Sequence, residues 1–259
     1  MAKALVQGAS RGLGLQFCRH ILERSPSAAV VATCRNPEEA TQLKLLKSSY
    51  PNNLRILQID VTREDHVQLA AASVKDDLGS LDLLINSAGI LHPSKRGETS
   101  LKDVTAHGLE ATFRTNTLGP MIMAKYFSPL LLKGQGAFGL TDRDKPHKGI
   151  IVNISAKVGS ITDNGLGGWY SYRLSKTALN MATKNLSIEL GRGKNKVICV
   201  SFHPGTVDSD LSRPYHKGVP EGKLFSVEHS VNLLMNNINN LKLENSGQFL
   251  NWDGTQLPY

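Results

Sequence analysis

Short apolar runs alternate with helix-like segments along this chain, and that alternation restricts the fold more than any other feature of the sequence. The runs that read as strands are residues 4–6, 29–33, 54–59, 81–85, 150–154, 196–201 and 247–250. Helical patterns lie between several of them, at residues 13–22, 37–49, 64–78, 105–132 and 172–190. Strands and helices of these lengths are typical of βαβ units, in which right-handed crossovers join parallel strands. The sequence therefore predicts an α/β fold built on a parallel sheet.

Length and composition indicate one domain. The chain has 259 residues, which fits a single large α/β domain over residues 1–259 better than two small ones. Hydrophobic residues make up 40% and charged residues 20%, so a core is expected and disorder is not. Residues 133–149 are rich in Gly, Lys and Asp, which predicts a long exposed loop.

Charge and cysteine content exclude several classes of protein. The formal net charge of +8 is scattered without a basic run, which argues against nucleic acid and leaves either modest steering of an anionic small molecule or a plain solvated surface. Cys18, Cys34 and Cys199 lie far apart, which is typical of reduced thiols in a cytoplasmic protein. The histidines show no ligand spacing, so no metal site is expected.

Nothing in the sequence predicts a membrane protein. No run of about 18 apolar residues is present. The first strand begins almost at Met1, so no signal peptide is expected, and a removed organelle transit peptide stays open as an alternative.

A glycine turn, Gly8-Ala9-Ser10-Arg11-Gly12-Leu13-Gly14, joins the first strand to the first helix. A strand, a glycine turn and a helix in this order direct backbone N–H groups and a helix N-terminus toward a phosphate. Glycine is required there because a Cβ would block close approach of a pyrophosphate. A tight structural turn is the alternative.

The end of the second strand carries Arg35 and no acidic residue. In dinucleotide-binding folds an acid at this point binds the ribose 2′-OH of NAD, whereas an arginine accommodates the 2′-phosphate of NADP. Arg11 adds a second positive charge in the glycine turn. We therefore expect NADPH as the cofactor, and a solvated strand-end arginine is the alternative.

Tyr172 and Lys176 are four residues apart, so a helix places them on one face. An ammonium beside a phenol favours the ionised form and is expected to lower the phenol pKa toward neutral. Such a tyrosine exchanges a proton with a substrate oxygen. Taken alone, the pair is more typical of an ordinary amphipathic helix with a surface lysine.

Five motifs occur along essentially the whole chain: the glycine turn, residues 86–89 (Asn-Ser-Ala-Gly), Asn116, the Tyr172 and Lys176 pair, and Pro204-Gly205. Their order and spacing resemble those of the short-chain dehydrogenase/reductase family. Residues 153–161 and 168–173 are most similar to its C-factor and sniffer-like carbonyl reductase branch. The resemblance implies a Rossmann-type, doubly wound parallel sheet of seven strands in the order 3-2-1-4-5-6-7, with helices on both faces. It also allows a homodimer or a homotetramer.

The resemblance implies a role for each matching residue. Tyr172 is expected to protonate the substrate carbonyl, Lys176 to hold the nicotinamide ribose and lower the tyrosine pKa, and Asn116 to fix a water that connects the lysine to solvent. The expected cofactor contacts are Gly8, Ser10, Arg11, Gly12, Leu13 and Gly14 for the phosphates, Arg35 for the 2′-phosphate, Asp60 and Val61 for the adenine, Asn86, Ala88 and Gly89 for the riboses, and Pro204, Gly205, Thr206 and Val207 for the nicotinamide.

The sequence departs from the family at one chemically important position. The family has Ser-Ser after Asn-Ile, and its second serine bonds the substrate oxygen, but here that position is Ala156. Ser155 is expected to face away, because neighbouring strand residues point to opposite faces, unless the strand bulges. Three alternatives stay open: Ser160 or another hydroxyl compensates, Ser155 turns inward as the catalytic donor, or the chemistry is slow.

The substrate pocket is expected from residues 89–98, 161–169 and 211–225, with residues 208–226 as a lid. Trp169, Tyr215 and Phe225 are expected to form an apolar aromatic wall, with plain loop packing as the alternative. The leading hypothesis is an oxidoreductase that transfers a hydride between NADPH and a carbonyl or alcohol on a small hydrophobic substrate. The alternative is a dinucleotide-binding signalling or regulatory protein of the C-factor type with little turnover.

Overall fold

A parallel sheet forms the centre of the computed structural model, which describes residues 1–140 and 146–259. Its strands are β1 (Lys3–Gln7), β2 (Ala29–Cys34), β3 (Leu54–Gln58), β4 (Leu83–Asn86), β5 (Gly149–Ile154), β6 (Val197–His203) and β9 (Phe249–Asn251). They lie in the order β3-β2-β1-β4-β5-β6-β9, and every neighbouring pair is parallel. The expected seven-stranded order is therefore confirmed.

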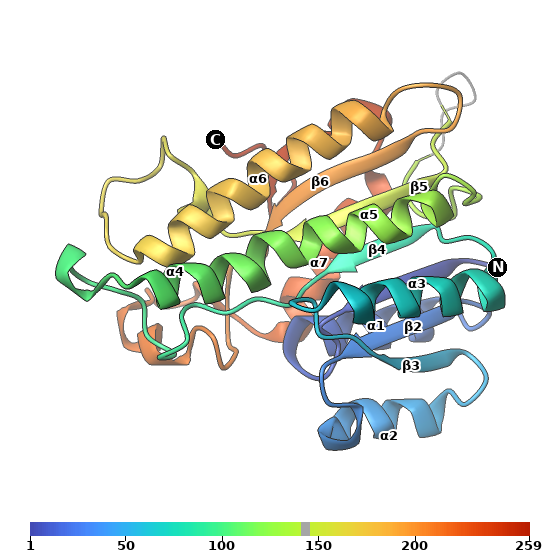
Figure 1. Cartoon of the computed structure of the whole chain (residues 1–259), viewed down its shortest axis with the longest axis horizontal. Helices are drawn as coiled ribbons and strands as arrows, with labels where there is room; N and C mark the ends of the chain where they lie inside the picture. The colour runs from blue at the N-terminus through green and yellow to red at the C-terminus, as the bar shows by residue number, and fades with distance from the viewer. Residues whose placement is uncertain (141–145) are drawn as a thin grey trace.

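Helices cover both faces of the sheet, as Figure 1 shows. One layer contains α3 (Glu64–Leu78), α5 (Gly119–Leu131) and α6 (Tyr170–Leu190). The other contains α1 (Gly12–Arg24), α2 (Thr41–Ser49) and α7 (Val227–Asn240). The two layers explain why the central strands read as continuous apolar runs, because both faces of the sheet are buried.

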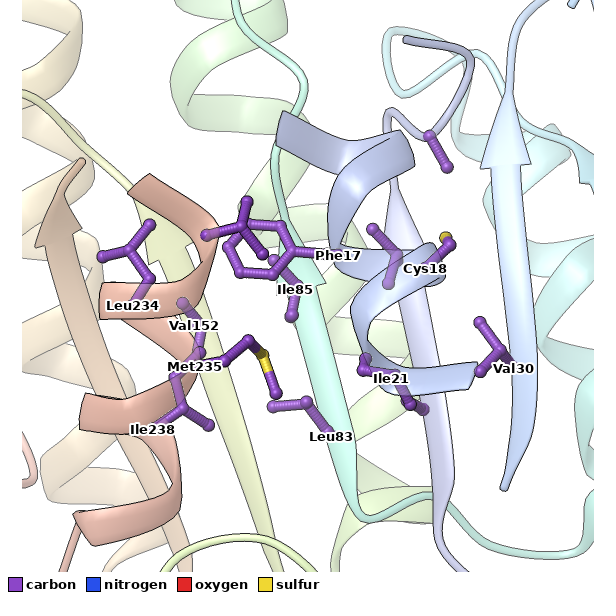
Figure 2. Packing of buried hydrophobic residues seen from close by; sticks show 14 of the residues in the cluster. Phe17, Cys18, Ile21, Val30, Leu83, Ile85, Val152, Leu234, Met235 and Ile238 are labelled. Carbon is purple, nitrogen blue, oxygen red and sulfur yellow. The ribbon is translucent and has the colours of Figure 1, made fainter. Parts of the chain in front are cut away.

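The core between the sheet and the α1/α7 layer is built from side chains of distant segments. Phe17 and Ile21 of α1 meet Leu234 and Met235 of α7 above the strands (Figure 2). Phe17 and Leu234 are completely buried. This packing fixes α1, and with it the glycine turn that precedes the helix, against the carboxyl end of β1.

Two expectations about the helices are wrong. The single helix expected over residues 105–132 is interrupted: α4 (Ala106–Phe113) leads into a π-helical turn (Arg114–Leu118) before α5 begins. The sequence reading also omitted α7, although Ser226 caps its first turn by accepting a hydrogen bond from His229 N at 3.1 Å. A π turn inside a helix often marks a functional site.

Short elements complete the chain. A two-stranded parallel sheet pairs β7 (Thr206–Val207) with β8 (Leu224–Phe225). The 3₁₀ turns are η1 (Pro37–Glu39), η2 (Leu101–Asp103), η4 (Lys157–Gly159), η5 (Arg213–Gly218) and η6 (Leu243–Asn245).

The segment expected as an exposed loop, residues 133–149, is partly buried. Phe138 is 6% exposed and His147 is 2% exposed, and the Leu140 N–H donates to the carbonyl of Leu241. Gly149 already belongs to β5. Residues 141–145 lie outside the described residues. Among the residues that are described, no helix is both long and apolar enough to cross a membrane.

Candidate active site

The glycine turn between β1 and α1 is shaped for close approach of a ligand. Gly8 and Gly12 have φ values of 82° and 57°, in the left-handed region that favours glycine. A Cβ at Gly8 would lie 2.6 Å from the Ala88 nitrogen, and one at Gly14 would overlap the Gly8 carbonyl oxygen. In this fully described stretch, α1 has no acidic residue in its first turn and no side-chain cap, so its N–H groups remain available to an anion.

The turn after β4 lies directly against the glycine turn. The Gln7 side chain accepts a hydrogen bond from the Ala88 N–H at 3.1 Å. Asn86 donates to the Asn153 side chain at 2.8 Å, and both residues are buried. The Oδ1 of Asn86 is buried without a hydrogen-bond partner among the described residues. These bonds bring residues 86–89 to the carboxyl edge of the sheet, where ligands bind in open α/β folds.

The expected adenosine-phosphate residues lie at the same edge. Arg35 follows β2 directly and is exposed, and its carbonyl accepts a hydrogen bond from Gln58 at 2.9 Å. The Asp60 carboxylate is held by the Thr62 N–H and hydroxyl at 2.9 and 2.7 Å. Arg11 reaches from the glycine turn to Asp210, with Nε 3.2 Å from the carboxylate.

Asn116 is completely buried in the π-helical turn and satisfied on both sides of its amide. Its Oδ1 accepts from the Ile90 N–H at 2.9 Å, and its Nδ2 donates to the Ile90 carbonyl at 2.8 Å and to the Ser175 hydroxyl at 3.0 Å. A Cβ at Gly89 would lie 3.4 Å from Asn116 Oδ1 and 3.6 Å from Lys176 Nζ. The Asn116 amide and the Lys176 ammonium therefore both lie next to Gly89.

Tyr172 and Lys176 lie on one face of α6 and are both buried, as their spacing predicted. The Lys176 Nζ donates to the Ile154 carbonyl at 2.8 Å and lies 5.6 Å from the centre of the Tyr172 ring. Burial lowers the pKa of Lys176 to about 8. The two side chains therefore share one desolvated site at the end of β5.

The expected lowering of the Tyr172 pKa is wrong in this structure. Burial raises the pKa of the phenol above its ordinary value. The ammonium is bonded to the Ile154 carbonyl, and desolvation is the dominant influence on the phenol. Tyr172 is consequently a protonated acid at neutral pH.

The hydroxyls near Ala156 form hydrogen bonds with residues other than Tyr172. The Ser155 N–H donates to the Phe202 carbonyl at 2.7 Å, which continues the pairing of β5 with β6, and Ala156 is extended with φ −155° and ψ 146°. Without a bulge, the Ser155 hydroxyl donates to Asn180 at 2.7 Å, so the geometry does not support Ser155 as a catalytic donor. Ser160 is 2% exposed, and its hydroxyl accepts from the Asp163 N–H at 3.1 Å.

Glu98 is a residue of the site that sequence reasoning missed. Its buried carboxylate accepts from the Ser171 N–H at 3.2 and 3.3 Å and from the Ser171 hydroxyl, and its backbone carbonyl accepts from the Trp169 N–H at 2.6 Å. It therefore caps the N-terminus of α6 from another part of the chain. Only its position within the expected pocket segment 89–98 pointed to it, because a cap supplied across 73 residues has no local pattern.

The expected aromatic wall is confirmed in part. The rings of Trp169 and Tyr215 lie 4.6 Å apart, and Trp169 meets Tyr172 edge-on at 6.3 Å. The Tyr215 hydroxyl accepts from the Gly97 N–H at 2.8 Å, which ties the expected lid to the loop after β4. Phe225 packs elsewhere, against Trp252 at 4.9 Å.

The turn expected at the nicotinamide, residues 204–207, follows β6. Gly205 has a φ of 81°, and a Cβ there would lie 2.6 Å from the Phe225 ring. The Ser230 hydroxyl donates to the Pro204 carbonyl at 2.7 Å, so α7 supports the turn. Phe225 therefore shapes the backbone of this turn.

Among residues 1–140 and 146–259, no three His, Cys, Asp or Glu side chains gather as a group that would hold a metal ion. The polar groups at the carboxyl edge of the sheet are instead amides, hydroxyls, a phenol and an ammonium. That set suits proton transfer and hydrogen bonding to an organic ligand.

Comparisons with known proteins agree with this geometry. A family model described as short chain dehydrogenase matches residues 2–219. The NADPH-bound carbonyl reductase from chicken fatty liver is 34% identical with a TM-score of 0.86, covering 100% of this chain and 99% of that one. Carbonyl reductase Sniffer of D. melanogaster is 34% identical with a TM-score of 0.88, covering 100% of both chains. The chain belongs to the short-chain dehydrogenase family and is an oxidoreductase of that family.

A relative of another kind is C-signal of Myxococcus xanthus, which is 32% identical over 181 residues, 70% of this chain and 94% of that protein. The expected resemblance to the C-factor and sniffer-like branch is thereby confirmed. The regulatory alternative is not favoured, because the chicken and D. melanogaster structures, which match the whole of this chain, are both carbonyl reductases.

The cap on α6 gives a first prediction. Glu98→Ala should lower the free energy of unfolding by about 1–3 kcal/mol, because the buried N–H and hydroxyl of Ser171 lose their acceptor. Glu98→Gln keeps an acceptor oxygen and should lose less. Urea denaturation provides the measurement, and Glu110→Ala, at an exposed glutamate of α4, should change stability by less than about 0.5 kcal/mol. Equal effects of the two alanine variants would show that Glu98 is no cap.

Burial of Lys176 gives a second prediction. Its pKa is about 8 in the folded protein against an ordinary 10.5, so between these values the unfolded state keeps a proton that the folded state has lost. Stability contributed by this group therefore rises with pH from about 8 toward 10.5. The free energy of unfolding of the wild type minus that of Lys176→Met, measured with urea from pH 7 to 9.5, should show this rise. The contributions of other titrating groups cancel in the difference. A difference that stays flat would contradict it.

Proposed function

We propose that the protein is an NADPH-dependent carbonyl reductase acting on small hydrophobic carbonyl compounds. The observation that carries the proposal is the convergence of buried Tyr172, Lys176 and Asn116 at the carboxyl ends of β4 and β5. The apolar and aromatic surroundings of Tyr172 support a hydrophobic substrate. The NADPH-bound carbonyl reductase from chicken fatty liver supports the choice of cofactor.

The residues present fit a dinucleotide. The glycine turn is a cradle that a Cβ at Gly8 or Gly14 would fill, and the buried Asn86 Oδ1 has no hydrogen-bond partner within residues 1–140 and 146–259. The proposed phosphate contacts are Gly8, Ser10, Arg11, Gly12, Leu13 and Gly14, with Arg35 for the 2′-phosphate. The remaining proposed contacts are Asp60, Val61, Asn86, Ala88, Gly89, Tyr172, Lys176, Pro204, Gly205, Thr206 and Val207.

When bound, NADPH supplies the hydride for the carbonyl carbon. Tyr172 donates the phenolic proton to the carbonyl oxygen, and its raised pKa keeps that proton in place until charge develops on the oxygen. Lys176 would hold the nicotinamide ribose and, with a pKa of about 8, would pass a proton back toward the phenolate. Asn116 lies in the π turn, near Lys176, and would fix the water that returns protons from solvent.

The acid role of Tyr172 gives the first functional prediction. Tyr172→Phe should reduce kcat/KM for aldehydes, ketones and quinones by about 10²–10⁴-fold, because it removes the general acid alone. Turnover is followed as NADPH consumption, and NADPH binding is followed separately by fluorescence titration. Binding should stay near the wild-type value, and retained turnover would refute the assigned role.

Arg35 gives the second functional prediction. Arg35→Ala should weaken NADPH binding by about ten- to a hundredfold, because a charged hydrogen bond to the 2′-phosphate is lost. NADH lacks that phosphate, so its affinity should stay nearly constant and serves as the internal control. A parallel loss for both nucleotides would place the 2′-phosphate elsewhere.

A further inference from the structure

We infer that Ala156 makes this a site with a single acid donor, which restricts efficient reduction to carbonyls made electron-poor by their own substituents. The inference rests on the proposed reductase function and names the class of substrate for that site. It follows from where the structure places the hydroxyls around Tyr172.

Ala156 occupies the position beside the acid. It is 9% exposed and forms a small buried cluster with Leu91 and Tyr172. Partly buried apolar residues pack against this cluster: Val158, Trp169, Leu211 and Tyr215. The face of the cluster next to the phenol therefore presents methyl and ring carbons.

The neighbouring serines do not make good the missing hydroxyl. The extended backbone at Ala156 sends Ser155 to the opposite face of the strand, where its hydroxyl donates to Asn180 at 2.7 Å. The Ser160 oxygen is buried and accepts from the Asp163 N–H at 3.1 Å. Ser175 is also withdrawn, because its hydroxyl donates to the Tyr172 carbonyl at 2.8 Å and accepts from Asn116.

The reaction shows why one donor matters. The carbonyl π bond breaks while a C–H bond forms with the hydride from NADPH and an O–H bond forms with the proton of Tyr172. The carbonyl compound is reduced to an alcohol, NADPH is oxidised to NADP⁺, and solvent returns a proton to the phenolate. Negative charge builds on the oxygen during this step, and loss of one preorganised donor costs about 10²–10³-fold in rate.

An electron-withdrawing substituent next to the substrate carbonyl offsets that loss. It spreads the developing charge away from the oxygen, so the reaction needs less stabilisation at that atom. The rings of Trp169 and Tyr215, 4.6 Å apart beside the cluster, offer surfaces for a flat ring on the same substrate. Electron-poor aryl ketones and aldehydes therefore match the site.

The test uses para-substituted acetophenones, from nitro to methoxy, with the full chain and NADPH. For the wild type, kcat/KM should fall steeply as the substituent becomes electron-donating. Ala156→Ser restores a second hydroxyl donor and should raise kcat/KM of the methoxy compound by about a hundredfold, with a smaller gain for the nitro compound. Ser155→Ala removes a bond to α6 and is expected to lower the overall rate, but it should keep the wild-type dependence on the substituent, because its hydroxyl donates to Asn180.

A second measurement does not depend on turnover. In complexes with NADP⁺, the infrared C=O stretch of bound acetophenone should lie at lower frequency in Ala156→Ser than in the wild type, because an added donor polarises the carbonyl. An unchanged stretch, a wild-type dependence flatter than that of borohydride reduction, or a steeper dependence in Tyr215→Phe, which would reveal the Tyr215 hydroxyl as a second donor, would each overturn the inference. If Ala156→Ser does not fold, the inference is tested by comparing the substituent dependence of the wild type with that of borohydride reduction.

Failure of the inference is distinguishable from failure of the proposed function. Wild-type protein that reduces the whole series with no dependence on the substituent is a reductase with a second donor. Wild-type protein that binds NADPH and reduces no member of the series, the nitro compound included, is not a carbonyl reductase of this class.

Discussion

Buried hydrogen bonds between α6 and the sheet hold the reacting groups in place. Lys176 donates to the Ile154 carbonyl, Ser155 to Asn180, and Asn153 to the Thr183 hydroxyl, all within 2.8 Å. An apolar interface tolerates small slips of a helix, whereas each of these bonds costs about 1–3 kcal/mol when a buried partner is left unpaired. These hydrogen bonds therefore fix the position of α6, and with it the positions of the Tyr172 phenol and the Lys176 ammonium.

The beginning of α6 is strained, and other parts of the chain support it. Gly167, Gly168 and Trp169 have φ values of 67°, 66° and 48°, so three successive residues lie in the left-handed region. For the tryptophan this costs about 1–2 kcal/mol. Its ring packs against Gly97 and Tyr215, and Glu98 binds the helix N-terminus, so the strained turn is held by tertiary contacts at the place where Tyr172 begins to face the site.

Patterns in the local sequence predicted the features of this protein that depend on residues close together in the chain. The parallel sheet follows from the alternation of elements, and the pairing of Tyr172 with Lys176 follows from helical spacing. The strand order came from the resemblance to the short-chain dehydrogenase/reductase family. The direction of the Tyr172 pKa was wrong, because burial and the partner of Lys176 depend on the tertiary structure. Glu98 was missed for the same reason, since its bonds to α6 join residues far apart in the sequence.

Burial moves both titrating groups of the site toward their neutral forms. It raises the pKa of Tyr172 and lowers that of Lys176 to about 8, because the charged form of each is disfavoured away from water. A reduction then begins with the proton already on the phenol, whereas oxidation of an alcohol requires the phenolate that burial opposes. With a pKa of about 8, Lys176 still carries a proton near neutral pH, and the Ile154 carbonyl accepts a hydrogen bond from it. If the proposed reductase function holds, Ala156 adds no hydroxyl donor beside the phenol, and the electron demand of the substrate itself then sets much of the barrier.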